Sequence, residues 1–230
     1  MATHVVNLGA GFDTRAHRFR QELRSTKVFE VDYGPTQEYK KRRVREVIGA
    51  PPPNLVYVPI DFTRQNLGEV LRKAGYRRDQ KTFFIWEGVT MYLPEDAVLA
   101  TLRFVAHDSV PGSSLVFDHY TRSYIDRLRL RTANQAQLAN EAERQAADEP
   151  FIFGIPDGTE QTFVNGAGLD LVEHIAGGSP EATQRYLTRR DGTLVGDVVL
   201  PRPTEGAGAG RFGYWLARAS VPTAGAAHPR

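Results

Sequence analysis

The feature that most constrains the fold is a short apolar run that ends in a glycine-rich turn near the start of the chain. Residues 5–13 read Val-Val-Asn-Leu-Gly-Ala-Gly-Phe-Asp, and a helix-like pattern follows. A strand that ends in Gly9-x-Gly11 lets the backbone approach a ligand closely, because glycine has no Cβ. The free N–H groups of the next helix point toward the same place. The pattern therefore predicts a nucleotide-type cofactor site at the end of the first strand.

The turn departs from the dinucleotide fingerprint Gly-x-Gly-x-x-Gly. The third glycine would stand at position 14, where the chain has Thr14, and the carboxylate of Asp13 comes just before it. A diphosphate prefers N–H groups and cations to a carboxylate. We therefore expect an adenosyl ligand without phosphates, for which S-adenosylmethionine is the obvious choice. The turn supplies the first expected cofactor-binding residues, Gly9, Ala10, Gly11 and Asp13.

Length and composition indicate one soluble domain over residues 1–230. The chain is 41% hydrophobic and 24% charged, and no apolar run approaches the ~20 residues that span a bilayer. No targeting segment precedes the first strand, so we expect a cytoplasmic protein without a membrane partner. The absence of cysteine excludes disulfides and Cys-based zinc sites, and we expect no metal. The net charge of +2 gives no argument for nucleic acid.

Strand-like and helix-like segments alternate through the first half of the chain. Strands are predicted at residues 5–8, 27–31, 55–58, 82–86 and 113–118. Helices are predicted at residues 14–24, 35–48, 65–74 and 94–107. This alternation is typical of an α/β fold with a mostly parallel sheet and helices on both faces. Such sheets bind ligands at the carboxyl ends of their strands.

The second half of the chain has a different pattern. Residues 122–149 are polar and favour a helix, so we expect a helical lid insertion at about residues 120–165. Further along we expect a strand at residues 169–175, a helix at 180–187 and a strand at 211–217. We expect a disordered tail at residues 221–230. Seven strands whose last two are joined by a hairpin-like return fit the methyltransferase variant of the doubly wound sheet.

Acidic residues follow four successive strands. Besides Asp13, they are Asp32, Asp61 and Glu87. Asp32 lies about 20 residues beyond the glycines, where a carboxylate accepts both ribose hydroxyls of an adenosine. Asp61 either accepts the adenine amino group, with Phe62 packed on the ring, or caps the next helix. Glu87 would face the cationic end of the ligand, where negative charge is favourable.

Four blocks of sequence carry a resemblance to a known family. They are Val-Val-Asn-Leu-Gly-Ala-Gly-Phe-Asp-Thr-Arg at 5–15, Phe-Glu-Val-Asp-Tyr at 29–33, Val-Pro-Ile-Asp-Phe at 58–62 and Trp-Glu-Gly-Val-Thr-Met-Tyr-Leu at 86–93. In their order and spacing the chain resembles the leucine carboxyl methyltransferase family, including its bacterial branch of S-adenosylmethionine-dependent methyltransferases, to about residue 120. The resemblance implies a Rossmann-like class I methyltransferase fold with S-adenosylmethionine as cofactor.

The resemblance also implies roles for individual residues. Gly9 would lie against the methionine part of the cofactor, and Glu87 by its amino end. Asp32 would bind the ribose, while Asp61 and Phe62 would hold the adenine. Members of this family usually have a helical N-terminal segment with basic residues that help to bind cofactor and substrate. We expect that this chain lacks that segment.

Methyl transfer from a sulfonium requires few catalytic side chains, because the donor is already activated. A carboxylate acceptor needs no base, whereas an alcohol or phenol needs one within hydrogen-bond reach. His119 is the candidate base, and a structural histidine is the alternative. Tyr92 either borders the transfer site or packs against the following helix. Arg122 and Arg127 either pair with an acceptor carboxylate or belong to a solvated helix face.

We therefore expect an S-adenosylmethionine-dependent O-methyltransferase that acts on a carboxyl or hydroxyl group of a small molecule. The second hypothesis is a shortened relative that binds the cofactor or a protein partner without turnover. The third is an NAD-dependent oxidoreductase. Thr14, Asp61 and Glu87 argue against the third hypothesis, because a dinucleotide would bring phosphate near these carboxylates.

Overall fold

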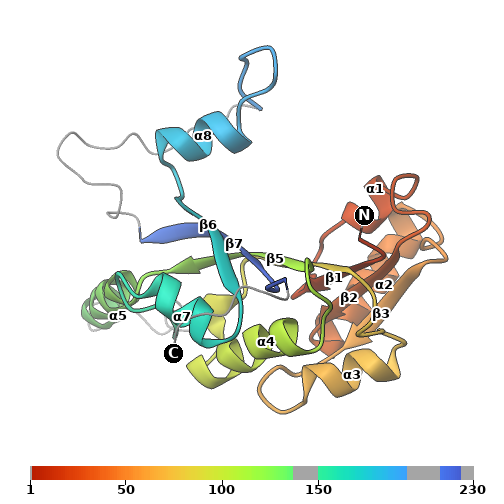
Figure 1. Ribbon diagram of the computed structural model, residues 1–230, viewed down its shortest axis with the longest axis horizontal. Helices are drawn as coiled ribbons and strands as arrows, with labels where there is room; N and C mark the ends of the chain where they lie inside the picture. Colours follow the sequence, from red (N-terminus) through yellow and green to blue (C-terminus); the bar gives the residue numbers. More distant parts are fainter. Residues whose placement is uncertain (1, 137–149, 196–212, 224–230) are drawn as a thin grey trace.

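Seven strands in the described part of the chain form one mixed sheet (Figure 1). The computed structural model describes residues 2–136, 150–195 and 213–223. The strand order is β3-β2-β1-β4-β5-β7-β6. The pairs among β1 to β5 are parallel, and β7 is antiparallel to both of its neighbours. The order reverses between β1 and β4, which is the point where open α/β sheets bind their ligands.

The strands are β1 (His4–Leu8), β2 (Lys27–Asp32), β3 (Leu55–Pro59), β4 (Thr82–Trp86), β5 (Ser114–Tyr120), β6 (Asp170–Ala176) and β7 (Tyr214–Ser220). The helices are α1 (Arg15–Arg18), α2 (Gly34–Val47), α3 (Leu67–Lys73), the 3₁₀ turn η1 (Thr90–Tyr92), α4 (Glu95–His107), α5 (Arg122–Ala136), α7 (Glu160–Gly166) and α8 (Pro180–Tyr186). The first six predicted strands are confirmed, and each begins within one residue of its predicted start. Of the predicted strand 211–217, residues 211 and 212 lie outside the described residues, and β7 begins at Tyr214.

The prediction of a first helix over residues 14–24 is wrong in length. α1 ends at Arg18, and irregular turns carry the chain on to β2. Phe19 is 44% exposed and the residues after it are mostly polar. This stretch therefore has no apolar stripe that a longer helix could bury against the sheet.

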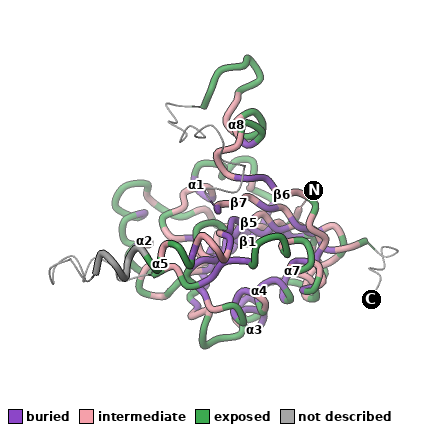
Figure 2. Tube along the Cα trace, turned by 90° about the vertical axis from the view of Figure 1, so that its left-hand side faces the viewer, coloured by how far each residue is buried: buried purple, intermediate pink, exposed green. Residues whose placement is uncertain are grey.

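One face of the sheet carries the main hydrophobic core. α3, α4 and α7 pack on this face, which is the lower side of the sheet in Figure 1. Alternate residues of the central strands point into it and are nearly inaccessible to solvent: Val6, Leu8, Phe84, Trp86, Leu115 and Phe117. Figure 2 shows this buried layer along the strands and α4. The core fixes the strand ends from which the candidate site is built.

The expected lid at residues 120–165 divides into three parts. Its first part is α5, and residues 137–149 lie outside the described residues. In its last part Phe153, Ile155 and Val164 are each only 1% exposed and belong to the core. The last part also contains α7, a helix that the sequence reading missed. The predicted tail at 221–230 is described only as far as residue 223.

The opposite face of the sheet is covered by α1 and α2 and carries a buried ion pair. Lys40 of α2 reaches Glu30 of β2 with an Nζ–Oε2 distance of 2.7 Å, and the two side chains are 3% and 2% exposed. Burial raises the pKa of Glu30, although Lys40 opposes part of this shift. Farther along the sheet, α8 stands away from the body of the protein (Figures 1 and 2). Arg185 of α8 forms an ion pair of 2.7 Å with Glu173 of β6.

We predict that Lys40→Met lowers the free energy of unfolding at pH 7 by about 3–5 kcal/mol, because it leaves the Glu30 carboxylate buried without a counterion. The adjacent Lys41→Met is the matched control. Lys41 pairs with the exposed Glu38 at 2.7 Å, and we expect a loss below about 1 kcal/mol. Urea unfolding measures both variants.

The loss caused by Lys40→Met should also depend on pH. Without Lys40 the pKa of Glu30 rises further above its value in the unfolded chain, so the folded state takes up the proton first as the pH falls. The deficit should therefore shrink in acid. Equal losses in the two variants, or a deficit that is constant from pH 7 to pH 5, would contradict this account of the pair.

Candidate functional site

The glycine turn connects β1 to α1 and is tied to the end of β2. The backbone N–H groups of Gly9 and Ala10 both donate to the Val31 carbonyl, at 2.7 and 3.0 Å. Gly9 has φ +70°, and a Cβ at this position would lie 2.2 Å from Cγ2 of Val89. Gly11 has φ +41°, and a Cβ there would meet no atom closer than 4.0 Å. A side chain at position 9 would thus collide with Val89. At position 11 the absence of a side chain leaves the backbone accessible.

Asp13 organises the start of α1. Its carboxylate accepts hydrogen bonds from Asn7 Nδ2 at 2.9 Å and from the backbone N–H of Arg15 at 2.6 Å. A carboxylate at this position satisfies free N–H groups of the helix and interacts favourably with its dipole. Asp13 is thereby held in place by β1 and by α1.

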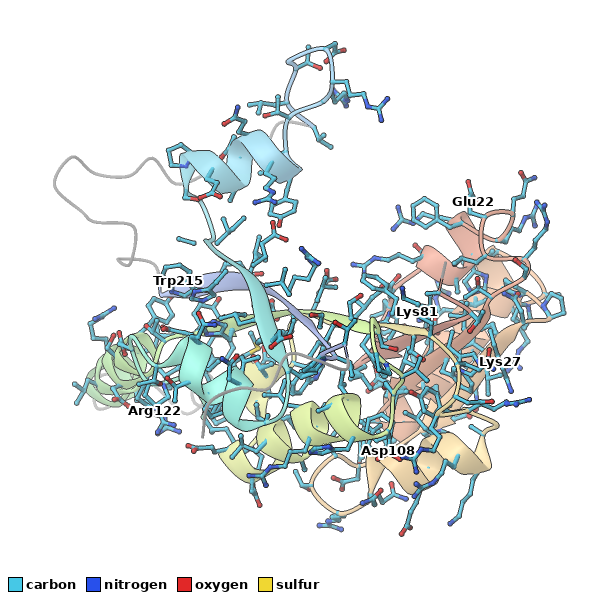
Figure 3. The ribbon with its side chains drawn as sticks, viewed as in Figure 1. Glu22, Lys27, Lys81, Asp108, Arg122 and Trp215 are labelled. Carbon is cyan, nitrogen blue, oxygen red and sulfur yellow. The ribbon has the colours of Figure 1, made fainter. Side chains whose placement is uncertain are left out.

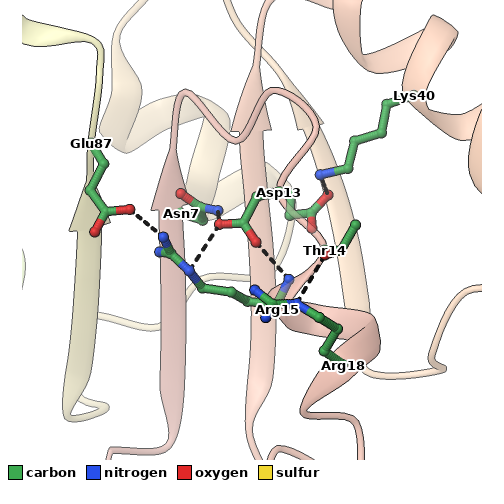
Figure 4. A network of polar contacts seen from close by, with 8 residues as sticks. Asn7, Asp13, Thr14, Arg15, Arg18, Lys40 and Glu87 are labelled. Atoms are coloured by element: carbon green, nitrogen blue, oxygen red, sulfur yellow. Dashed lines mark hydrogen bonds and ion pairs between the residues drawn. The ribbon is translucent and has the colours of Figure 1, made fainter. Parts of the chain in front are cut away.

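An open pocket of about 440 Å³ lies beside this turn. Its lining residues are Asn7, Gly9, Ala10, Gly11, Phe12, Asp13, Thr14, Arg15, Arg18 and Glu87. Arg15 lies across it, with its Nε 3.4 Å from Asp13 Oδ2 and its guanidinium bonded to Glu87 at the end of β4 (Figure 4). The structure thus brings together five of the residues predicted to bind cofactor, namely Gly9, Ala10, Gly11, Asp13 and Glu87.

Asp32 lies at the neighbouring strand end and is hydrogen-bonded to the glycine turn. Its carboxylate accepts from the backbone N–H of Gly11 and, at 2.6 Å, from that of Tyr33. Asp32 does not line the pocket itself. The contact with Gly11 nevertheless places its carboxylate next to the turn, as its position after β2 predicts.

Asp61 and Phe62 follow β3, at the same edge of the sheet. Asp61 Oδ1 accepts from the backbone N–H of Thr63 at 2.9 Å and from its hydroxyl at 2.6 Å. These two hydrogen bonds lower the pKa of Asp61. Phe62 is partly buried against the hydrophobic core. Neither residue lines the pocket, and Asp61 has the local hydrogen bonds of a turn carboxylate.

His119 is fully buried inside the sheet layer. The Tyr120 carbonyl accepts from its Nδ1 at 3.1 Å, and its Nε2 lies 3.0 Å from Nε2 of His174. The two imidazole rings are stacked with centroids 5.2 Å apart, and His174 stacks in turn on Trp215. Burial lowers the pKa of His119 to about 4, so the ring is neutral at pH 7. The structure does not bring His119 to the pocket.

Tyr92 lies in η1 and is 38% exposed. Its ring packs edge-on against Phe151 with centroids 5.2 Å apart. Tyr120 lies 5.3 Å from the same phenylalanine ring and stacks on Tyr124 at 4.9 Å. Tyr92 therefore belongs to an aromatic cluster at the end of β5 and the start of β7 that also includes Tyr214.

The two arginines expected at the start of the lid are held by neighbouring groups. Arg122 donates to the Gly154 carbonyl at 3.0 Å and pairs with Glu95 at 3.2 Å. The Arg127 guanidinium lies over the Tyr124 ring, 6.0 Å from its centroid.

The sequence reading gave no role to Asp118 and Tyr214, which form a hydrogen-bonded pair. Asp118 Oδ1 accepts from the backbone N–H of Gly88 at 2.8 Å, and Oδ2 accepts from the Tyr214 hydroxyl at 2.9 Å. Burial raises the pKa of Asp118. Through Asp118, hydrogen bonds connect Gly88, the residue after Glu87, to β5 and β7. A signal for Asp118 was present, because it is another carboxylate at a strand end, but nothing in the sequence indicates its partner 96 residues away.

Comparison with known proteins identifies related sequences. The model of the leucine carboxyl methyltransferase family matches residues 1–106, which contain β1 to β4 and the whole pocket. Over these residues the chain is similar to the leucine carboxyl methyltransferase family. It is 36% identical over 177 residues to YktD of Bacillus subtilis, which is named as an S-adenosyl-L-methionine-dependent methyltransferase, and the match covers 76% of this chain and 56% of YktD. A protein of Mycolicibacterium gilvum with the same type of name is 35% identical over 171 residues, which are 74% of this chain and 52% of that protein.

Solved structures show the same fold at low sequence identity. The mitomycin 7-O-methyltransferase MmcR superimposes with a TM-score of 0.52 at 11% identity, covering 96% of this chain and 49% of MmcR. The magnesium protoporphyrin IX methyltransferase ChlM of Synechocystis gives 0.51 at 10% identity, covering 94% and 73%. The chain thus has the Rossmann-like fold of class I methyltransferases.

The chain spans about half the length of the curated family relatives that it matches. No helix in the described part of the chain is long and apolar enough to cross a bilayer.

We predict a pH dependence of stability from His119. The pKa of its imidazole is about 4 in the folded protein against 6.5 ordinarily, so below about pH 6.5 the unfolded chain takes up a proton that the folded protein refuses. Stability therefore falls as the pH drops from 6.5 toward 4, with a limiting slope of about 1.4 kcal/mol per pH unit from this group. His119→Gln should remove that contribution. Urea unfolding between pH 7 and pH 4.5 measures it, and an unchanged slope in the variant would refute the burial argument.

Proposed function

We propose that this chain binds S-adenosylmethionine at the carboxyl edge of β1, β2, β3 and β4 and uses it to methylate a carboxyl or hydroxyl group of a small molecule. The observation that carries the proposal is the contact between Asp32 and the N–H of Gly11. It joins the acid expected to bind a ribose to the turn expected to face the cofactor. The family match over residues 1–106 and the names of the relatives support the same cofactor.

The residues at this edge fit an adenosyl ligand with a cationic amino-acid end. Each carboxylate oxygen of Asp32 accepts one backbone N–H and retains a lone pair for a ribose hydroxyl. The open space beside Gly11 leaves room for a ligand to approach the backbone. Asp13 and Glu87 contribute negative charge, which stabilises a nearby cation.

S-adenosylmethionine supplies a methyl group on a positively charged sulfur. The contribution of the protein is to hold the two reactants in line and to exclude competing orientations. In the proposal, Asp32 holds the ribose, Asp61 and Phe62 border the adenine, and Glu87 faces the amino-acid end. The aromatic cluster with Tyr92 lies at the end of β5 and the start of β7, and we assign it to the acceptor side of the proposed site. A carboxylate acceptor needs no base, which suits a site whose candidate histidine, His119, is buried away from the pocket.

Binding of the cofactor gives a direct test. We expect S-adenosylhomocysteine to bind the full chain in isothermal titration calorimetry, and Asp32→Asn to weaken it by roughly tenfold or more, because hydrogen bonds to a charged acceptor are lost. Asp79→Asn is the control, since Asp79 pairs with Arg77 on an exposed loop at 2.8 Å. A full chain that binds NADH but no adenosyl thioether would overturn the proposal.

Turnover is tested separately with a labelled methyl donor. We expect the label to be transferred to one or more members of a panel of small carboxylates and phenols, and the transfer to disappear in Asp32→Asn. Tight cofactor binding without transfer to any member of the panel, or to a panel extended to alcohols, would instead favour the second hypothesis, a binding module without turnover.

A further inference from the structure

The charged groups of the pocket are balanced. Its ten lining residues include two carboxylates, Asp13 and Glu87, and two guanidiniums, Arg15 and Arg18. A ligand end that carries one positive and one negative charge matches such a lining better than a simple cation or anion does. The free amino-acid end of the proposed ligand, with its α-ammonium and α-carboxylate groups, has this character.

The Arg15 guanidinium contacts two carboxylates of the pocket. It donates a hydrogen bond to Glu87, whose side chain is 49% exposed, and its Nε lies 3.4 Å from Asp13 Oδ2. Asp13 is held in addition by hydrogen bonds from Asn7 and from the backbone N–H of Arg15. Among the described residues Glu87 has no hydrogen-bond or ion-pair partner other than Arg15. Asp13 therefore stays in place when Arg15 moves, whereas Glu87 is left open to another cation.

Arg15 keeps its positive charge in the pair with Glu87. Burial disfavours the charged form of Arg15, but the hydrogen bond to Glu87 and the charges of Glu87 and Asp13 outweigh it and raise the pKa of Arg15. A partly exposed ion pair of this kind contributes little to stability. Replacing it with two new ion pairs to a bound molecule would therefore cost little.

We propose that Arg15 and Glu87 form a receptor for a zwitterionic α-amino acid end, in which the ligand ammonium takes the place of Arg15 on Glu87 and the released guanidinium binds the ligand carboxylate. This inference rests on the proposed function and deepens it, since it assigns the carboxylate of the cofactor to Arg15. The planar guanidinium suits a carboxylate because it donates two parallel hydrogen bonds. Asp13 keeps the guanidinium beside the pocket during the exchange.

The receptor also explains why an arginine lies between the two carboxylates of the pocket. In the absence of ligand, Arg15 pairs with Glu87 and offsets part of its negative charge. When the ligand is bound, its ammonium takes over that task. The charge of the pocket is thus balanced in both states.

The experiment compares, by calorimetry on the full chain, two thioethers whose sulfur carries no charge. S-adenosylhomocysteine has the amino-acid end, and 5′-methylthioadenosine lacks it. We expect Arg15→Gln to weaken S-adenosylhomocysteine by roughly tenfold to a hundredfold, as for the loss of charged hydrogen bonds, and to change 5′-methylthioadenosine by less than about twofold. Arg77→Gln is the matched control, because Arg77 also pairs with an aspartate two residues away, at 2.8 Å, on an exposed loop.

Each other outcome overturns a defined part of the argument. An equal loss for both thioethers in Arg15→Gln would make Arg15 a structural residue of the turn and overturn the receptor. Unchanged binding of S-adenosylhomocysteine in Arg15→Gln, or a loss in Arg18→Gln instead, would also overturn it while the cofactor site remained. If the unaltered chain bound neither thioether, the proposed function itself would fail, and the receptor with it.

Discussion

The hydrogen bonds between the glycine turn and the end of β2 are the constraint on which the candidate site depends. The Val31 carbonyl receives two N–H groups of the turn, and Asp32 receives a third, from Gly11. These bonds continue the parallel β1–β2 ladder beyond the last strand residues. They hold the turn against the end of β2, directly before the start of α1. The position of Arg15, and therefore the shape of the pocket, follows from them.

The fold could be predicted from the sequence because it depends on local patterns that the core then enforces. Apolar runs such as 82–86 are strands of the buried sheet, and the helices predicted at residues 65–74 and 94–107 begin within two residues of their predicted starts. The first helix was overextended, because helix-forming residues after Arg18 have no apolar face to bury. The helix α7 was missed because its short apolar pair, Phe163 and Val164, lies within a segment interpreted as a lid.

The site was less predictable, because its details depend on contacts between distant residues. Strand ends meet at one edge in a parallel sheet, so the grouping of Asp13, Asp32 and Glu87 follows from topology. The sequence gives no information on which side chain is free. His119 contacts a histidine 55 positions away, and Asp118 accepts a hydrogen bond from a tyrosine on an antiparallel strand. Arg15 was passed over because its role appears only when Glu87 is placed opposite to it.

The acidic character of this edge also requires a cation beneath it. Glu30 lies behind the turn, and besides its burial the charges of Asp13 and Asp32 raise its pKa. A buried lysine is costly by itself, yet Lys40 lies 2.7 Å from Glu30 and offsets these neighbouring carboxylates as well. The ion pair therefore contributes more than local stability. It also places a positive charge beneath the carboxylates that face a cationic ligand in the proposed function. Lys40 thus balances negative charge beneath the site permanently, whereas in our proposal Arg15 balances Glu87 only until a ligand binds.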